Sequence, residues 1–151
     1  MLFRSSSIIT ANQAAAGTYG TGTATATLTV TAPALTTAAP TPPVRNAANV
    51  ISLFSDAYTN VTVDTWSAVW DNANVEDVSI GGNNTKKYSN LFYAGVEFTS
   101  STVNATNMEN FHMDVYTPDA TVFKVKLVDF GPNGTYGGGD DVEHEIGRAH
   151  V

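Results

Sequence analysis

The residues with the clearest chemical potential lie in an acidic, glycine-rich segment, residues 129–141, with the sequence DFGPNGTYGGGDD. Asp129 is followed by Asn133, Gly134 and Asp140 at the spacing of an EF-hand-type calcium loop, with Gly131 where a third ligand would stand. Calcium prefers hard oxygen ligands on a sharply turning loop, and glycines permit the turns. We therefore expect a structural Ca²⁺ held by Asp129, Asn133, Asp140 and Asp141. The alternative is a solvated, metal-free turn.

Aromatic side chains form a second chemical set. The apolar face of a sugar ring packs on an aromatic ring, while neighbouring acids and amides bind its hydroxyls. Trp66 and Trp70 are four residues apart among Thr, Asp and Asn, and Tyr136 lies in the glycine-rich segment. With Tyr58, these residues are the candidate carbohydrate-binding set. The alternative for each is burial in a core, where large aromatic residues usually lie.

Acids and histidines offer no comparable catalytic set. His144 stands between Glu143 and Glu145, but neighbouring residues on a strand point to opposite faces. The pairs Glu76–Asp77 and Asp140–Asp141 diverge for the same reason and make poor acid–base pairs. His112 is more typical of a surface or cross-strand partner. We therefore expect a non-catalytic protein.

Composition narrows the class of partner. The chain of 151 residues has 7 basic and 14 acidic residues, a formal net charge of −7. Nucleic-acid binding needs a basic footprint, so that class is disfavoured, as are anionic membrane surfaces. No apolar run approaches the roughly 20 residues of a membrane span, so we expect no membrane insertion. Few charges, many Thr and Asn and no Cys are typical of secreted β-domains, which predicts an extracellular or cell-surface location.

The pattern of apolar residues predicts an all-β fold. Residues 23–30 alternate strictly, and Phe92, Ala94, Val96 and Phe98 predict another alternating strand over residues 92–98. Residues 111–116 and 123–127 also alternate, and the intervening TPDA predicts a hairpin turn between them. No stretch shows a persuasive helical period. Strands with one apolar face, separated by Gly, Asn and Asp turns, favour a two-sheet sandwich.

Three zones follow one another along the chain. Residues 6–31 are rich in Ala, Thr and Gly and end in the alternating strand. Residues 32–45 contain four prolines within APALTTAAPTPPV and are expected to form an extended, semi-rigid linker. Residues 46–145 are richer in aromatic and acidic residues and are expected to form a separate domain.

The two ends have a different character. Residues 146–151, IGRAHV, are a translation of a common short-read sequencing adapter, and residues 1–5, MLFRS, are a translation of its reverse complement. We therefore expect both segments to be adapter-derived and the remainder to be a fragment of a longer protein. Such segments are set aside when a fold is predicted.

A family resemblance rests on several spaced motifs of residues 46–145. These are VISLFSDAY at 50–58, TW at 65–66, KYSNL at 87–91, FHMDVYT at 111–117, FKVKLVDFG at 123–131 and GGGDDVEHE at 137–145. Together they resemble a non-catalytic, galactose-binding-like β-sandwich module of secreted bacterial glycan-degrading proteins. Separately, IITANQA at 8–14, Tyr19 and TLTV at 27–30 resemble the last strands of a bacterial Ig-like repeat.

The resemblance implies an incomplete jelly-roll β-sandwich whose C-terminal strands are missing, preceded by the tail of an Ig-like domain. It implies a glycan-binding module linked covalently to further domains of a polysaccharide-degrading protein. The ligand would be a neutral or lightly charged polysaccharide, because the acidic chain repels sulfated or uronate-rich ones. Two alternatives stay open: a structural spacer of a large surface protein, and a catalytic lyase or hydrolase sandwich.

Overall fold

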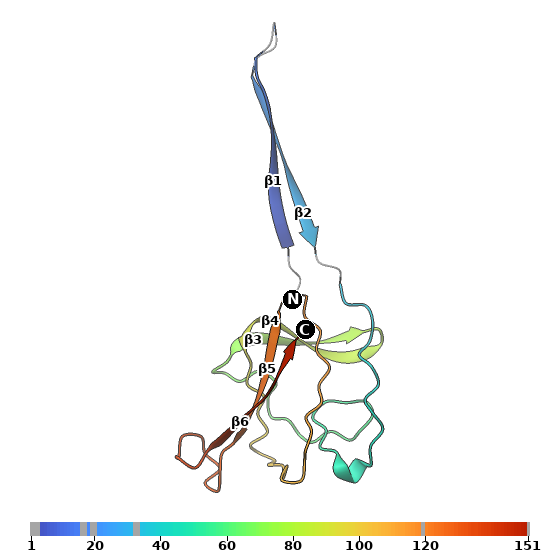
Figure 1. The fold of residues 1–151 in the computed structure, drawn as a ribbon, viewed down its shortest axis with the longest axis vertical. Helices are drawn as coiled ribbons and strands as arrows, with labels where there is room; N and C mark the ends of the chain where they lie inside the picture. Colours follow the sequence, from blue (N-terminus) through green and yellow to red (C-terminus); the bar gives the residue numbers. More distant parts are fainter. Residues whose placement is uncertain (1–3, 16–17, 19–20, 32–33, 119, 151) are drawn as a thin grey trace. The chain divides into compact units, whose positions relative to one another are not determined.

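The computed structural model describes residues 4–15, 18, 21–31, 34–118 and 120–150. They form an all-β fold of small antiparallel sheets, as the sequence predicted. The strands are β1 (Arg4–Gln13), β2 (Gly22–Thr31), β3 (Asn72–Ile80), β4 (Asn83–Tyr93), β5 (Val122–Asp129) and β6 (Val142–His150). They pair as three hairpins, β1–β2, β3–β4 and β5–β6 (Figure 1). A 3-10 turn, η1 (Ala47–Asn49), is capped by the Asn46 side chain.

The chain divides into two compact units, residues 1–35 and 36–151. In the first unit β1 pairs with β2 in a continuous antiparallel register, from Arg4 opposite Thr31 to Gln13 opposite Gly22. Alternating Thr with Ala, Leu and Val favours extended backbone in β2. The predicted strand at residues 23–30 is thus confirmed.

The second unit begins inside the Pro-rich segment that was predicted to be a linker. The Tyr58 hydroxyl accepts a hydrogen bond from the Arg45 backbone N–H and donates one to the Pro43 carbonyl, both at 2.8 Å. Gly81 lies against the backbone of Thr36 and Ala38, where a Cβ would come within 2.7 Å of the Ala38 nitrogen. Residues 36–45 are therefore fastened to the domain that follows, and we call them the N-terminal strap.

The β3–β4 hairpin was not foreseen from the sequence. Its two-residue turn is Gly81–Gly82, with φ of 57° and 84°. Positive φ at both central residues is the type I′ arrangement that suits strand twist, and glycine adopts it without steric cost. The Gly-Gly pair between two runs of extended residues was the available signal.

The predicted pairing of residues 111–116 with 123–127 is wrong. Residues 123–127 do form a strand, within β5, but residues 111–116 have no regular structure and β6 is the partner instead. Lys124 and Lys126 form ion pairs with Glu145 and Glu143 at 3.1 and 2.9 Å. Both ion pairs are diagonal, since Lys126 lies opposite Glu145 and Lys124 lies opposite Arg148 in the register. Long side chains can reach such diagonal neighbours.

The prediction of a strand over residues 92–98 is also wrong in extent. β4 ends at Tyr93, and the segment after it contributes one isolated bridge, between Glu97 and Thr65. Both segments expected to be adapter-derived contribute strand residues: Arg4–Ser5 lie in β1, and Ile146–His150 lie in β6. In the described part of the chain, no helix is long and apolar enough for a membrane span.

Burial is shallow. Among the described residues, Ala68 is the buried apolar side chain and Ser52 the buried polar one. Ser52 donates to the Asn60 side chain at 2.6 Å, and Asn60 in turn bonds to both backbone groups of Ser55. Hydrogen bonds between loops therefore hold much of the region around β3–β4.

Candidate functional site

Three exposed aromatic residues lie beside one another at the end of β4 and in the loop before β3: Trp70, Phe92 and Tyr93. We call them the aromatic platform. The Trp70 and Tyr93 rings are stacked, with centroids 6.3 Å apart and planes inclined by 20°. Phe92 meets Tyr93 edge to face at 5.8 Å. Trp70 is 58% exposed and Phe92 is 85% exposed. The platform therefore offers a substantial aromatic surface to solvent.

Hydrogen bonds fix the two stacked rings. The Trp70 indole N–H donates to Oε1 of Glu97 at 2.8 Å, and the Tyr93 hydroxyl donates to the Trp70 carbonyl at 3.2 Å. Gly95 is buried against the indole, and a Cβ there would stand 2.5 Å from its Cη2 atom. Gly95 is thus the residue whose lack of a side chain lets Trp70 take this position.

The segment that carries Gly95 and Glu97 is tied to the loop before β3. Ala68 N–H donates to the Gly95 carbonyl, and Gly95 N–H donates to the Asp71 carboxylate, both at 3.0 Å. Glu97 exchanges backbone hydrogen bonds with Thr65, at 3.0 and 3.3 Å. These bonds join residues that are more than twenty positions apart in sequence, so tertiary folding assembles the platform.

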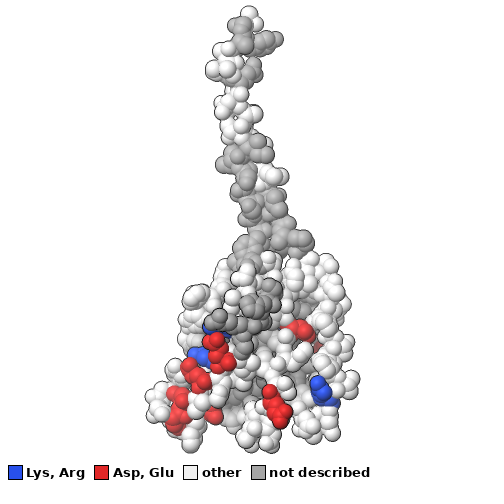
Figure 2. Space-filling model, in the orientation of Figure 1, with Lys and Arg blue, Asp and Glu red and all other residues white. Residues whose placement is uncertain are grey.

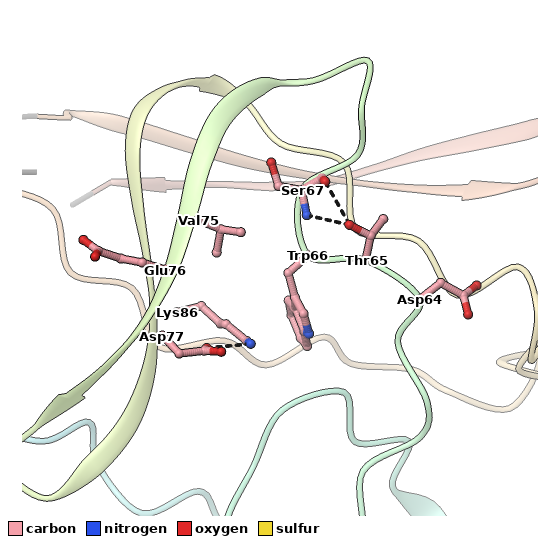
Figure 3. Close-up of a pocket in the computed structure, with 8 residues that line it drawn as sticks. All are labelled: Asp64, Thr65, Trp66, Ser67, Val75, Glu76, Asp77 and Lys86. Carbon is pink, nitrogen blue, oxygen red and sulfur yellow. Dashed lines mark hydrogen bonds and ion pairs between the residues drawn. The ribbon is translucent and has the colours of Figure 1, made fainter.

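A pocket of about 320 Å³ lies beside this loop. The residues that line it are Asp64, Thr65, Trp66, Ser67, Val75, Glu76, Asp77 and Lys86 (Figure 3). We call it the Trp66 pocket. Two residues that line the pocket also connect to the supports of the platform. Thr65 forms the bridge to Glu97. The Ser67 hydroxyl donates to the Asp71 carboxylate, which also accepts the Gly95 N–H. The pocket and the platform therefore share one hydrogen-bonded support.

The charged groups of the pocket are paired within the protein. Lys86 lies over the rings of Trp66 and Phe54, 5.0 and 5.2 Å from their centroids, and pairs with Asp77 at 2.6 Å. Figure 3 shows the Lys86 amine directed toward both Asp77 and Trp66. Such an ammonium–aromatic contact is favourable, and it occupies a ring face that a sugar would need.

Two other groups of this region have shifted pKa values. Hydrogen bonds from the side chain and backbone of Ser100 lower the pKa of Asp64 below its ordinary value of 3.8. Burial raises the pKa of Tyr88 above 10.0, and the negative charges of Asp71 and Asp77 add to the rise. The Tyr88 hydroxyl donates to the Trp66 carbonyl at 2.7 Å. The Asp64 carboxylate and the Tyr88 hydroxyl thus each form a hydrogen bond that joins two segments distant in sequence.

The four predicted carbohydrate-binding residues lie in different surroundings. Trp70 belongs to the platform. Trp66 is half-buried and packs edge to face on Phe54 at 5.5 Å. Tyr58 holds the N-terminal strap. Tyr136 is 65% exposed, with Phe130 beside it at 5.9 Å. No hydrogen bond or ring contact joins any two of these four in the described part of the chain.

The platform and its supports include residues outside the predicted binding set. Phe92 and Tyr93 fall in the strand predicted over residues 92–98, and Tyr93 is also one of the aromatic residues available for sugar stacking. The supporting residues Gly95 and Glu97 are not sequence candidates. The sequence signal for an exposed aromatic residue was the adjacent pair Phe92–Tyr93, shortly before Gly95. Because neighbouring residues of a strand point to opposite faces, packing on one face of the sheet cannot bury both rings.

The predicted calcium ligands are close in sequence but mostly bonded within their own loop. Asp129 accepts from the Gly131 N–H at 2.9 Å, and Asp140 accepts from the backbone and side chain of Asn133. Asp141 accepts from the Gly137 N–H through Oδ2 at 2.6 Å, while its Oδ1 is buried and has no hydrogen-bond partner among the residues that the structure describes. The residues described contain no group of three or more His, Cys, Asp or Glu able to hold a metal ion. The unpaired Asp141 oxygen is compatible with a cation, whereas the internal bonds of Asp129 and Asp140 compete with one.

Acidic side chains predominate on one face of the molecule. In the view of Figure 2, Asp and Glu gather where β5–β6 lies in Figure 1, with basic side chains beside them. The ion pairs Lys124–Glu145 and Lys126–Glu143 belong to this hairpin. The acids there are therefore partly neutralised by cross-strand lysines.

Comparison with known proteins adds no relative: no protein-family profile matches the chain, and no curated protein or solved structure is significantly similar to it.

Proposed function

We propose that this chain is a non-catalytic glycan-binding module and that the aromatic platform is its binding surface. The observation that carries the proposal is the pair Trp70–Tyr93: two exposed, nearly parallel rings held by hydrogen bonds. A sugar ring gains by packing its C–H face on such a surface, and rings fixed in advance lose little freedom on binding.

The surroundings of the platform suit a neutral polysaccharide. The chain has a net charge of −7, and the Glu97 carboxylate bonds to the indole of Trp70. The Asp71 carboxylate bonds to Gly95, the residue that lies against that indole. Carboxylates accept hydrogen bonds from hydroxyl groups and repel anionic sugars. The galactose-binding-like jelly roll and the extracellular location expected from the sequence are part of the same proposal.

The test is affinity electrophoresis of the 151-residue chain in gels containing a β-glucan, a galactan or a mannan. One of these should retard the chain, and Trp70→Ala should abolish the retardation while Tyr116→Ala, an exposed aromatic residue outside the platform, should not. Tyr136→Ala reports separately on the other exposed candidate. A structural spacer predicts no retardation by any of the three, and that result would reject the proposal.

We keep structural calcium as a second proposal, centred on the unpaired Oδ1 of Asp141. A ligand that binds only the folded state stabilises it, by about 2.7 kcal/mol at a hundredfold excess over Kd. EDTA should therefore lower Tm, and calcium should restore it. An absent chelator effect, or one that persists unchanged in Asp141→Asn, would exclude this site.

A further inference from the structure

Glu97 has one carboxylate oxygen committed to the platform and one that is not. Oε1 accepts the Trp70 indole N–H at 2.8 Å. Among the residues that the structure describes, Oε2 has no hydrogen-bond partner, and the side chain is only partly buried. A carboxylate thus lies at the edge of an exposed indole with a free acceptor.

The backbone of Glu97 is held as firmly as its side chain. Its carbonyl accepts from the N–H groups of Asp64 and Thr65, at 2.8 and 3.3 Å, and its own N–H donates to the Thr65 carbonyl at 3.0 Å. Since both ends of the residue are fixed, Oε2 is a preorganised acceptor. A preorganised acceptor binds a ligand without the cost of ordering a side chain.

The position of this acceptor complements a stacked sugar. A pyranose ring packed on the Trp70 face directs its hydroxyl groups outward, past the edge of the indole. Hydrogen bonds to a charged acceptor are stronger than those between neutral groups. We propose that Glu97, through Oε2, is the hydroxyl-recognition residue of the platform and selects neutral, hydroxyl-rich sugar rings over anionic ones. This inference rests on the proposed function and adds the residue that determines specificity.

The decisive variant is Glu97→Gln. Its amide oxygen can still accept the indole N–H, but the second position becomes an N–H₂ donor. The 151-residue chain and its variants are compared by affinity electrophoresis in the β-glucan, galactan or mannan that retards the unmodified chain. Glu97→Gln should weaken the affinity about tenfold, in line with the loss of one charged hydrogen bond. The matched control, Glu109→Gln, changes an exposed acid outside the platform and should leave the affinity unchanged.

A spectroscopic measurement separates recognition from support. The two tryptophans give two indole ¹H–¹⁵N resonances, and the Trp70 resonance should remain sharp and hydrogen-bonded in Glu97→Gln. If Glu97→Gln keeps full affinity while Trp70→Ala loses it, this inference fails and the proposed function stands. If the affinity falls but the Trp70 resonance broadens or loses its hydrogen-bonded shift, Glu97 only positions the ring and the inference is again overturned. If none of the three polysaccharides retards the unmodified chain, both proposals fall.

Discussion

The region of residues 52–100 and the region of residues 101–150 each contain one antiparallel hairpin, yet they are stabilised differently. In the first, loop residues bond to distant segments: Asp64 to Ser100, Trp70 to Glu97, and Tyr88 to the Trp66 carbonyl. Both hairpins carry two cross-strand ion pairs, those of Lys86 and Lys87 in the first region and those of Lys124 and Lys126 in the second. In the second region the Asn133–Asp140 bond stays within a single loop. A β-hairpin alone is marginally stable in water, so the surrounding ties decide which region is rigid.

Exposed apolar side chains sharpen the contrast. In the second region they include Phe111, Met113, Val115 and Leu127. In the first region three of the four exposed aromatic residues form one fixed group, the platform, and Phe54 is the fourth. Val69 and Leu91 are exposed there as well. The comparison shows that exposure has two meanings: an ordered surface of aromatic rings can bind a ligand, whereas scattered apolar residues without fixed partners reduce stability.

The largest expected effect is a difference in local stability between the two regions. Each large apolar side chain left uncovered forfeits about 1.5–3 kcal/mol, and whole domains are stable by only about 5–15 kcal/mol. We expect the amides of Val125 and Leu127 to exchange at least about tenfold faster than those of Thr65 and Glu97. Hydrogen exchange of the 151-residue chain measures this difference. Equal protection of the amides in both regions would remove the contrast.

A smaller loss of stability is expected from a substitution at Gly95, which lies in close contact with the Trp70 indole. In Gly95→Ala the new Cβ would stand 2.5 Å from the indole, so the ring or the loop must shift. Overpacking of this kind typically costs about 1–3 kcal/mol. The free energy of unfolding in urea measures the cost, and the Trp70 indole resonance reports the shift. Gly22→Ala is the control, since no atom of the described residues, its two chain neighbours apart, lies within 4 Å of its Cβ position. Equal effects of the two substitutions would show that the contact is unimportant.

Two adjacent lysines allow a finer test of the first region. Lys86 pairs with Asp77 and covers two aromatic rings, and its side chain is 17% exposed, whereas Lys87 pairs with Glu76 at a more exposed position. Lys86→Ala should cost about 1–2 kcal/mol, because a partly desolvated ammonium–aromatic contact is lost. Lys87→Ala should cost about 0–1 kcal/mol, as exposed ion pairs usually do. Thermal unfolding of both variants measures the two losses of stability. A larger loss for Lys87→Ala than for Lys86→Ala would contradict the packing role of Lys86.

The smallest expected effect is a dependence of stability on acid pH. The folded-state pKa of Asp64 is lowered from 3.8 by its hydrogen bonds with Ser100. The unfolded state therefore binds a proton first as the pH falls, so the contribution is present above pH 3.8 and is lost below it. Asp64→Asn should show a flatter fall in Tm between neutral pH and the acid range than the unmodified chain. Parallel Tm profiles would show that this carboxylate has no part in the acid sensitivity.

Local pattern was enough to predict some of these features. Alternation of β-branched and apolar residues identified the strands at residues 23–30 and 123–127, and Trp70 could be selected as an aromatic candidate from its neighbours alone. Alternation did not identify the partner of a strand. Residues 111–116 alternate as well as β6 does, yet β6 supplies the paired strand, and its Glu143 and Glu145 reach Lys126 and Lys124 diagonally.

The amino-acid sequence by itself determined the all-β class, the acidic balance and the inventory of aromatic residues, because these depend on residue type and on periods of two. Only the tertiary structure decided which aromatic residues act together. Trp66 and Trp70 stand four apart, yet Lys86 covers one and Tyr93 stacks on the other. Gly95 and Glu97 gain their significance from lying against Trp70, some 25 positions earlier in the chain. Such contacts are set by how distant segments pack, and no local sequence pattern encodes them.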